Sequence, residues 1–207
     1  MRFSVSALLI LSPVLIHGLI MAGRLDWAMY WLGGVIGIWG LISLASRKGK
    51  SAAGLVMLTA AGALLLLPAW RGQQLFRFIP LAMYLSLALL FASTLLPQRT
   101  PLITRFAFLM RQGKMPDEVI HYTRRVTLLW VLFFCSMAAV TLWLALFGDI
   151  HDWSLFVNVI SYVLMALLFL AEFAYRRWRL GKLVDYSFTE FLGGLVRLDY
   201  AQLFRSR

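Results

Sequence analysis

Cysteine and charge are both scarce in this chain. A single cysteine, Cys135, stands among 207 residues, so no disulfide can form within the chain and a disulfide-stabilised secreted domain is excluded. Charged residues make up only 14% of the sequence, compared with about 25% in an average soluble domain. No CxxC pair, HExxH helix or Walker loop occurs, which leaves the common metal, redox and nucleotide motifs without support.

Histidine is almost as rare, and its three positions do not suggest a haem site. A haem held between membrane helices needs axial ligands at matching depth. His17 is alone in the first apolar run, and His121 and His151 are expected on opposite sides of a membrane. We interpret Asp149, His151 and Asp152 as solvated residues of an outer loop. The sequence therefore predicts no catalytic residue, no metal and no cofactor.

Apolar residues are in excess instead. They make up 61% of the chain, and the mean hydropathy is +0.80. A soluble domain of this length could not bury so much apolar surface. The net charge of +11 comes from Lys and Arg in short clusters between apolar runs, which is the pattern of topology signals and of contact with anionic lipid headgroups. This pattern favours a membrane protein with no nucleic-acid partner.

Six apolar runs are long enough to cross a hydrocarbon core of about 30 Å. The first is interpreted as an uncleaved anchor, because a second run follows it directly. The sequence thus predicts an all-α, polytopic membrane protein with six transmembrane helices. The predicted spans are residues 4–22, 27–45, 52–70, 75–96, 126–147 and 153–175.

The distribution of the basic residues predicts the orientation. If both termini and the loops after the second and fourth spans are cytoplasmic, only Arg24, Arg71 and Arg77 of the 20 Lys and Arg residues lie outside. This bias supports an N-in, C-in orientation.

Four regions follow from these predictions. Residues 1–97 form a four-helix transmembrane half, 98–125 a basic amphipathic cytoplasmic segment, 126–175 a transmembrane hairpin, and 176–207 a basic amphipathic tail. Within the second region, apolar residues between Leu102 and Met110 recur at helical spacing, with Thr104, Arg105 and Arg111 on the opposite side, which predicts a helix lying in the membrane interface. A second helix is expected to begin around Met115-Pro116-Asp117-Glu118 and to continue as the fifth span.

The candidate site is the cytoplasmic end of the last hairpin. Glu172 is an ionisable group inside a span and should be paired. Arg124 or Arg125 at the inner end of the fifth span could reach it, and Arg176, one turn after it, competes. A structural salt bridge and a functional carboxylate both remain open. The other predicted binding residues are Tyr122 beside these arginines, Asn158 and Tyr162 on one face of the sixth span, expected to bond to neighbouring helices, and the basic loop residues Arg105, Arg111 and Lys114.

A resemblance rests on the second half of the chain. Residues 78–179 contain LLPQRTPLITRFAFLM, then MPDEVIHYTRRVTLLWVLFF, then W-x-L-F-x-N-x-I-S-Y-x-L-M-x-L-L-F-x-x-E and a basic run. This half resembles a family of small bacterial inner-membrane proteins encoded with aryl-polyene and xanthomonadin-type pigment biosynthesis genes. The resemblance implies a role in making or moving a polyene lipid, beside acyl carrier proteins and an exporter.

Two functions and a weaker third are therefore expected. The first is an accessory subunit that docks acyl-chain biosynthesis or export machinery at the cytoplasmic leaflet, with anionic phospholipid, an acidic acyl carrier protein or other membrane subunits as partners. The alternative is a lipid-handling carrier or flippase with a groove at spans five and six. A membrane-bound transferase ranks lowest, because no nucleophile or base stands out.

Overall fold

The computed structural model describes residues 2–45, 51–66, 73–111 and 116–181, and these residues are almost entirely helical, with no strand among them. Four helical stretches are long and apolar enough to cross a membrane, namely Leu25–Ala45, Gln74–Ser93, Asp117–Phe147 and Ile150–Leu180. Two shorter apolar helices, Leu11–Met21 and Gly54–Leu66, accompany them. The tail predicted for residues 182–207 lies outside the described residues. The described chain forms two units, residues 1–81 with 140–162 and residues 82–139 with 163–207.

The first unit is built from the N-terminal helices α1 (Arg2–Met21), α2 (Leu25–Ala45) and α3 (Ser51–Leu66), with the short helix α4 (Gln73–Phe76). Helix α8 (Ile150–Leu155) and the π-helix η2 (Phe156–Ile160) complete it and pack against α1. Trp153, only 1% exposed, is the centre of its core. The indole of Trp153 lies 5.8 Å from the ring of Phe76 and donates a hydrogen bond of 3.2 Å to the carbonyl of Arg77. A large apolar ring with its polar group satisfied is what a buried tryptophan requires.

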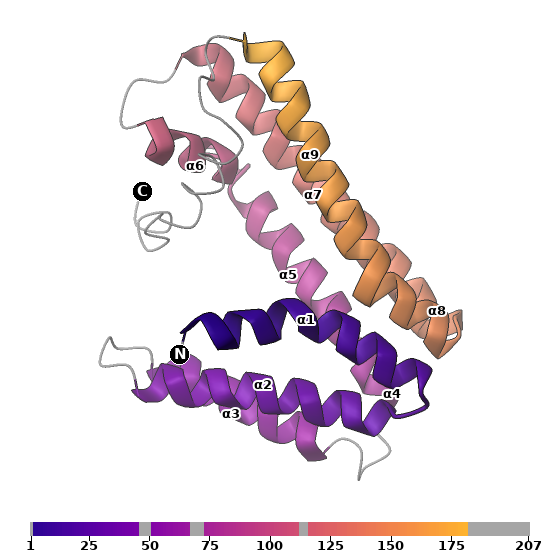
Figure 1. Cartoon of the computed structure of the whole chain (residues 1–207). Helices are drawn as coiled ribbons and strands as arrows, with labels where there is room; N and C mark the ends of the chain where they lie inside the picture. Colours follow the sequence, from indigo (N-terminus) through magenta and orange to yellow (C-terminus); the bar gives the residue numbers. More distant parts are fainter. Residues whose placement is uncertain (1, 46–50, 67–72, 112–115, 182–207) are drawn as a thin grey trace. The chain divides into compact units, whose positions relative to one another are not determined.

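Glycine allows α2 and α3 to approach closely, and the two helices lie side by side in Figure 1. A Cβ placed on Gly54 would lie 2.7 Å from Cγ of Leu44 and 3.0 Å from the carbonyl oxygen of Gly40. Not every glycine of α2 takes part in this contact, because a Cβ on Gly34 would meet nothing within 4 Å. The contact between α2 and α3 is therefore confined to the glycines on one face of each helix.

A polar chain links α1 to α8 and η2 inside this unit. Nδ1 of His17 lies 3.0 Å from Oγ of Ser154, and the amide of Asn158 donates to the same oxygen at 3.2 Å and to the Ser154 carbonyl at 3.1 Å. Ser154 is fully buried. The prediction that Asn158 bonds to a neighbouring helix is wrong for its amide group, since both hydrogen bonds stay within its own helical segment. His17, which appeared isolated in the sequence, is the residue that crosses to the other helix.

The predicted outer loop is shorter than expected. The carboxylate of Asp149 accepts a hydrogen bond of 2.7 Å from the backbone N–H of His151 and caps α8. This bond, with the nearby charges of His151 and Arg77, holds the pKa of the Asp149 carboxyl below its usual range. His151 and Asp152 therefore belong to the first turn of α8 and are not loop residues, because Asp149 supplies the acceptor that starts the helix.

The second unit contains most of α5 (Ile79–Ser93), helix α6 (Leu102–Arg111), the first part of α7 (Asp117–Phe147) and most of α9 (Ser161–Leu180). Helix α7 is continuous over 31 residues, as the start signal at Asp117 and Glu118 predicted. Aromatic rings join its helices: Trp130 lies 6.3 Å from Phe91 of α5 and 6.0 Å from Phe169 of α9.

Helix α6 forms where the sequence predicted it, but Thr104 on its predicted polar side is buried. Thr104 is 3% exposed, and its hydroxyl lies 2.7 Å from the hydroxyl of Thr123 on α7. The backbone N–H of Ile103 also donates to the Thr127 hydroxyl at 3.4 Å. Threonine hydroxyls that form a hydrogen bond with each other can be buried without leaving a polar group unsatisfied. One side of the predicted interface helix is thus a packing surface against α7.

Candidate functional site

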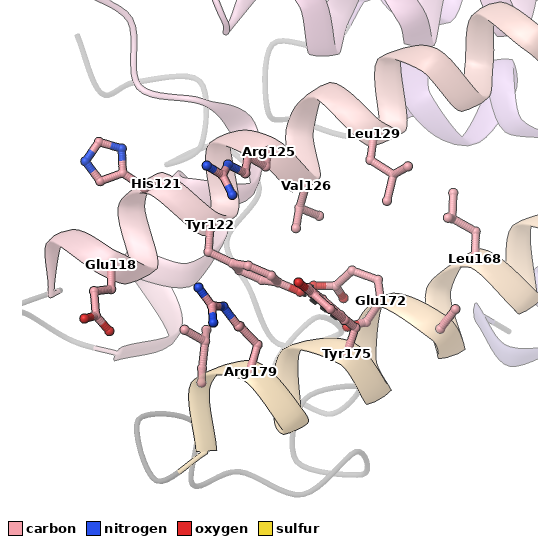
Figure 2. A pocket seen from close by; sticks show the side chains of 12 residues that line it. Glu118, His121, Tyr122, Arg125, Val126, Leu129, Leu168, Glu172, Tyr175 and Arg179 are labelled. Atoms are coloured by element: carbon pink, nitrogen blue, oxygen red, sulfur yellow. Dashed lines mark hydrogen bonds between the residues drawn. The ribbon is translucent and has the colours of Figure 1, made fainter.

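A cleft of about 710 Å³ opens between α7 and α9 within the second unit (Figure 2). Every described residue that lines it belongs to one of these two helices. The lining residues are Glu118, His121, Tyr122, Arg125, Val126, Leu129, Leu168, Ala171, Glu172, Tyr175, Arg179 and Leu180.

Helical spacing brings these side chains to one face of each helix. On α7 the lining residues recur three or four positions apart from Glu118 to Leu129, and on α9 they do so from Leu168 to Arg179. Residues at this spacing lie above one another on a helix surface. Val119 packs against Leu180, so the beginning of α7 lies beside the end of α9 and the helices run antiparallel.

Two of the lining residues, Tyr122 and Glu172, form a cluster with Arg176. The Tyr122 hydroxyl donates a hydrogen bond of 3.1 Å to Oε1 of Glu172. Nε of Arg176 lies 3.5 Å from the same oxygen, and the side chains of Arg176 and Glu172 are only 8% and 9% exposed. The ring of Tyr175 stacks on that of Tyr122 with their centroids 6.2 Å apart. A carboxylate buried to this extent is stable because it has both a cation and a hydrogen-bond donor.

The two ends of the cleft differ in polarity. Glu118, His121 and Arg125 on α7 and Arg179 on α9 lie at one end (Figure 2). Val126, Leu129 and Leu168 line the other end, toward the rings of Trp130 and Phe169. This arrangement can hold a molecule with a charged group at one end and an apolar chain at the other.

Three of the predicted site residues line this cleft: Tyr122, Arg125 and Glu172. The ion pair of Glu172 is formed by Arg176, one of the alternatives that the sequence left open. Arg124 does not take part, because its Nη2 donates a hydrogen bond of 3.1 Å to the backbone carbonyl of Leu95. Successive helical residues point about 100° apart, so Arg124 and Arg125 could not both face α9.

The other predicted site residues lie elsewhere. Asn158 belongs to the polar chain of the first unit, and Tyr162, 48% exposed, does not line the cleft. Nε of Arg105 donates a hydrogen bond of 2.9 Å to the Thr100 carbonyl. The Arg111 side chain and the whole of Lys114 lie outside the described residues.

Sequence reasoning missed four polar lining residues: Glu118, His121, Tyr175 and Arg179. The sequence did contain a signal for these residues, because the polar side chains recur at helical spacing. Glu118, Tyr122 and Arg125 are four and then three positions apart, and Glu172, Tyr175 and Arg179 are three and then four positions apart. It could have been found by scoring polar as well as apolar side chains for helical period.

The described residues contain no group of three His, Cys, Asp or Glu side chains close enough to hold a metal ion. No protein-family model, curated protein or solved structure matches the chain. The relation to pigment-associated membrane proteins therefore stays a prediction, and the function is argued from the cleft.

Proposed function

We propose that the protein is a lipid-handling membrane protein that binds an anionic amphiphile in the cleft between α7 and α9. The observation that carries this proposal is the polarity of the cleft, whose arginine-bearing end continues into an apolar end. Arg125 and Arg179 provide planar donors that match a phosphate or carboxylate. The leucine and valine side chains below them would contact an acyl chain.

The lengths of the two helices support a headgroup site. Asp117–Phe147 and Ile150–Leu180 each contain 31 residues, which corresponds to about 46 Å of helix at 1.5 Å per residue. The hydrocarbon core of a bilayer is about 30 Å thick. Each helix therefore extends well beyond the hydrocarbon when it crosses the bilayer, and the charged residues of the cleft lie at its end, where lipid phosphates are found.

The wider setting of this proposal is the topology expected from the sequence: six spans, both termini in the cytoplasm, and a bacterial inner membrane. The cationic end of the cleft would then face the inner leaflet. Cysteine accessibility to a membrane-impermeant maleimide tests this orientation in a Cys135→Ser background. A cysteine replacing Arg99 should be protected in intact cells, and one replacing Asp149 should react; the opposite pattern would overturn the orientation.

Photocrosslinking tests the lipid site. Purified protein in phosphatidylcholine nanodiscs would receive a photoactivatable phosphatidylglycerol, with label mapped by peptide mass spectrometry. We expect label within residues 118–129 and 168–180. The Arg125→Gln/Arg179→Gln double variant should lose it by at least tenfold, because each guanidinium gives a charge-assisted hydrogen bond worth about 1.5 kcal/mol or more.

The matched control is the Arg99→Gln/Arg177→Gln double variant. It removes the same charge from the second unit, but both residues are exposed and neither lines the cleft. It should keep the label of the unmodified protein. Equal labelling of all three proteins would show that the cleft residues do not hold the headgroup. Labelling spread along all helices would show that the lipid contacts the protein only as part of the surrounding bilayer and has no specific site.

Docking of an acidic acyl carrier protein ranks below this proposal. Of its expected basic surface, Arg105 and Arg124 each donate to a backbone carbonyl.

A further inference from the structure

We propose that the cleft selects a lipid whose headgroup is a singly charged phosphodiester that also carries a hydroxyl group, and that Glu172 is the residue that recognises this hydroxyl. The inference rests on the proposed function and names the headgroup chemistry of the same site. It assigns Glu172 a role separate from the arginines, which attract the phosphate.

The two oxygens of the Glu172 carboxylate differ in their surroundings. Oε1 accepts the hydrogen bond from Tyr122 and lies next to Nε of Arg176. In the part of the chain that the structure describes, no hydrogen bond reaches Oε2, although the side chain lines the cleft. Figure 2 shows the carboxylate between the two helices, next to the stacked rings of Tyr122 and Tyr175.

A carboxylate accepts hydrogen bonds and donates none. When a bound ligand covers Oε2, an acceptor left without a donor loses free energy relative to one that is paired. A ligand group that completes the shell of Glu172 must therefore be a donor. Since Oε1 is already held by Tyr122 and Arg176, the carboxylate has a fixed position and offers Oε2 in a defined direction, which favours recognition by geometry.

The charge balance distinguishes a hydroxyl from an ammonium group. The cleft residues Arg125 and Arg179, together with Arg176 behind Glu172, carry three positive charges, and Glu118 and Glu172 carry two negative charges. A ligand of net charge −1 balances the excess. A phosphodiester with a neutral hydroxyl has this charge, whereas a zwitterionic phosphate and ammonium headgroup does not.

Two lipids that differ only in the hydroxyl test the inference. Phosphatidylglycerol and phosphatidylmethanol with identical acyl chains are both singly charged phosphodiesters, but only phosphatidylglycerol carries free hydroxyls. Competition of each against the photoactivatable lipid gives relative affinities. We expect phosphatidylglycerol to bind about tenfold more tightly, as is reasonable for one hydrogen bond to a carboxylate. Phosphatidylethanolamine, which offers an ammonium donor without the net charge, should bind more weakly than phosphatidylglycerol.

Substitutions assign the preference to one carboxylate. In Glu172→Gln the ratio between the two lipids should fall to about twofold or less. Asp117→Asn removes an exposed acidic group that does not line the cleft and should keep the ratio. Glu172→Asp keeps the negative charge but draws the carboxylate back by one methylene group, so it should also lower the ratio, which covers the case in which Glu172→Gln does not fold.

The outcomes separate this inference from the proposed function. If phosphatidylglycerol and phosphatidylmethanol compete equally at the cleft, or if Glu172→Gln keeps the preference, the role of Glu172 is refuted and the lipid site stands. A phosphatidylethanolamine affinity equal to that of phosphatidylglycerol refutes the hydroxyl assignment. Failure of every lipid to compete refutes the proposed function itself.

Discussion

The ion pair between Glu172 and Arg176 offers a quantitative test of how the cleft is held together. Nε of Arg176 lies 3.5 Å from Oε1 of Glu172. At this distance, two unit charges attract by about 5 kcal/mol for an effective dielectric constant near 20. Both side chains are less than a tenth exposed, so solvent screens the attraction little. Desolvation of the two groups opposes much of this energy.

The perturbation is a double-mutant cycle with Glu172→Gln and Arg176→Gln. Each single change leaves the other charge buried, which costs about 3–5 kcal/mol in comparable pairs. We expect the lower end, near 3 kcal/mol, because 3.5 Å is long for a charge-assisted contact. The double variant should lose about 2 kcal/mol less than the sum of the two single changes, because it leaves neither charge behind.

The free energy of unfolding can be measured by sodium dodecyl sulfate titration in mixed micelles, followed by far-ultraviolet circular dichroism. Arg176 also lies over the ring of Phe173, with its Cζ 5.4 Å from the centroid, and the cycle removes this separate contribution from the pair energy. Arg177→Gln is the control, since Arg177 is exposed and adjacent. Additivity within about 0.5 kcal/mol would refute the view that the two charges stabilise each other.

Three further predictions concern other parts of the fold. Gly54→Ala should lower the free energy of unfolding by about 1–3 kcal/mol through overpacking, whereas Gly62→Ala, where a Cβ meets nothing within 4 Å, should be close to neutral in the same titration. Thr104→Val removes the buried hydroxyl contact with Thr123 and should cost about 1 kcal/mol, measured as a shift in the unfolding midpoint. The pKa of Asp149 is lower in the folded protein than in the unfolded chain. Its contribution to stability is therefore present above the usual pKa near 4 and disappears as the pH falls through the lower folded value. Asp149→Asn should flatten the dependence of stability on pH in that acidic range, and an unchanged slope would contradict the capping role.

Much of the fold could be predicted because helix signals are local. Pro116, Asp117 and Glu118 predicted the start of α7, and the apolar period after Leu102 predicted α6. The length of each apolar run was enough to predict its helix. What the sequence could not supply was the partner of each helix face. Thr104 was assigned to the exposed side because its polarity is the only local signal, yet a second threonine on another helix satisfies it.

The candidate site was predicted only in its centre. Glu172 stood out because a charge inside an apolar run is unusual, and Tyr122 and Arg125 because they lie at the end of a span. Arg179 did not stand out, since it belongs to a basic run in which every residue looks like a topology signal. Asn158 was included because polarity within a span is informative, but it precedes Leu168, the first lining residue of its helical stretch, by ten positions, or about 15 Å of helix.

In the part of the chain that the structure describes, the cleft is walled by α7 and α9, and this has a consequence for exchange kinetics. A lipid could enter and leave between these two helices, sideways from its own leaflet. Residence time would then be governed by how quickly the headgroup breaks its polar contacts. Variants at Arg125 or Glu172 should shorten residence and leave the association rate nearly constant.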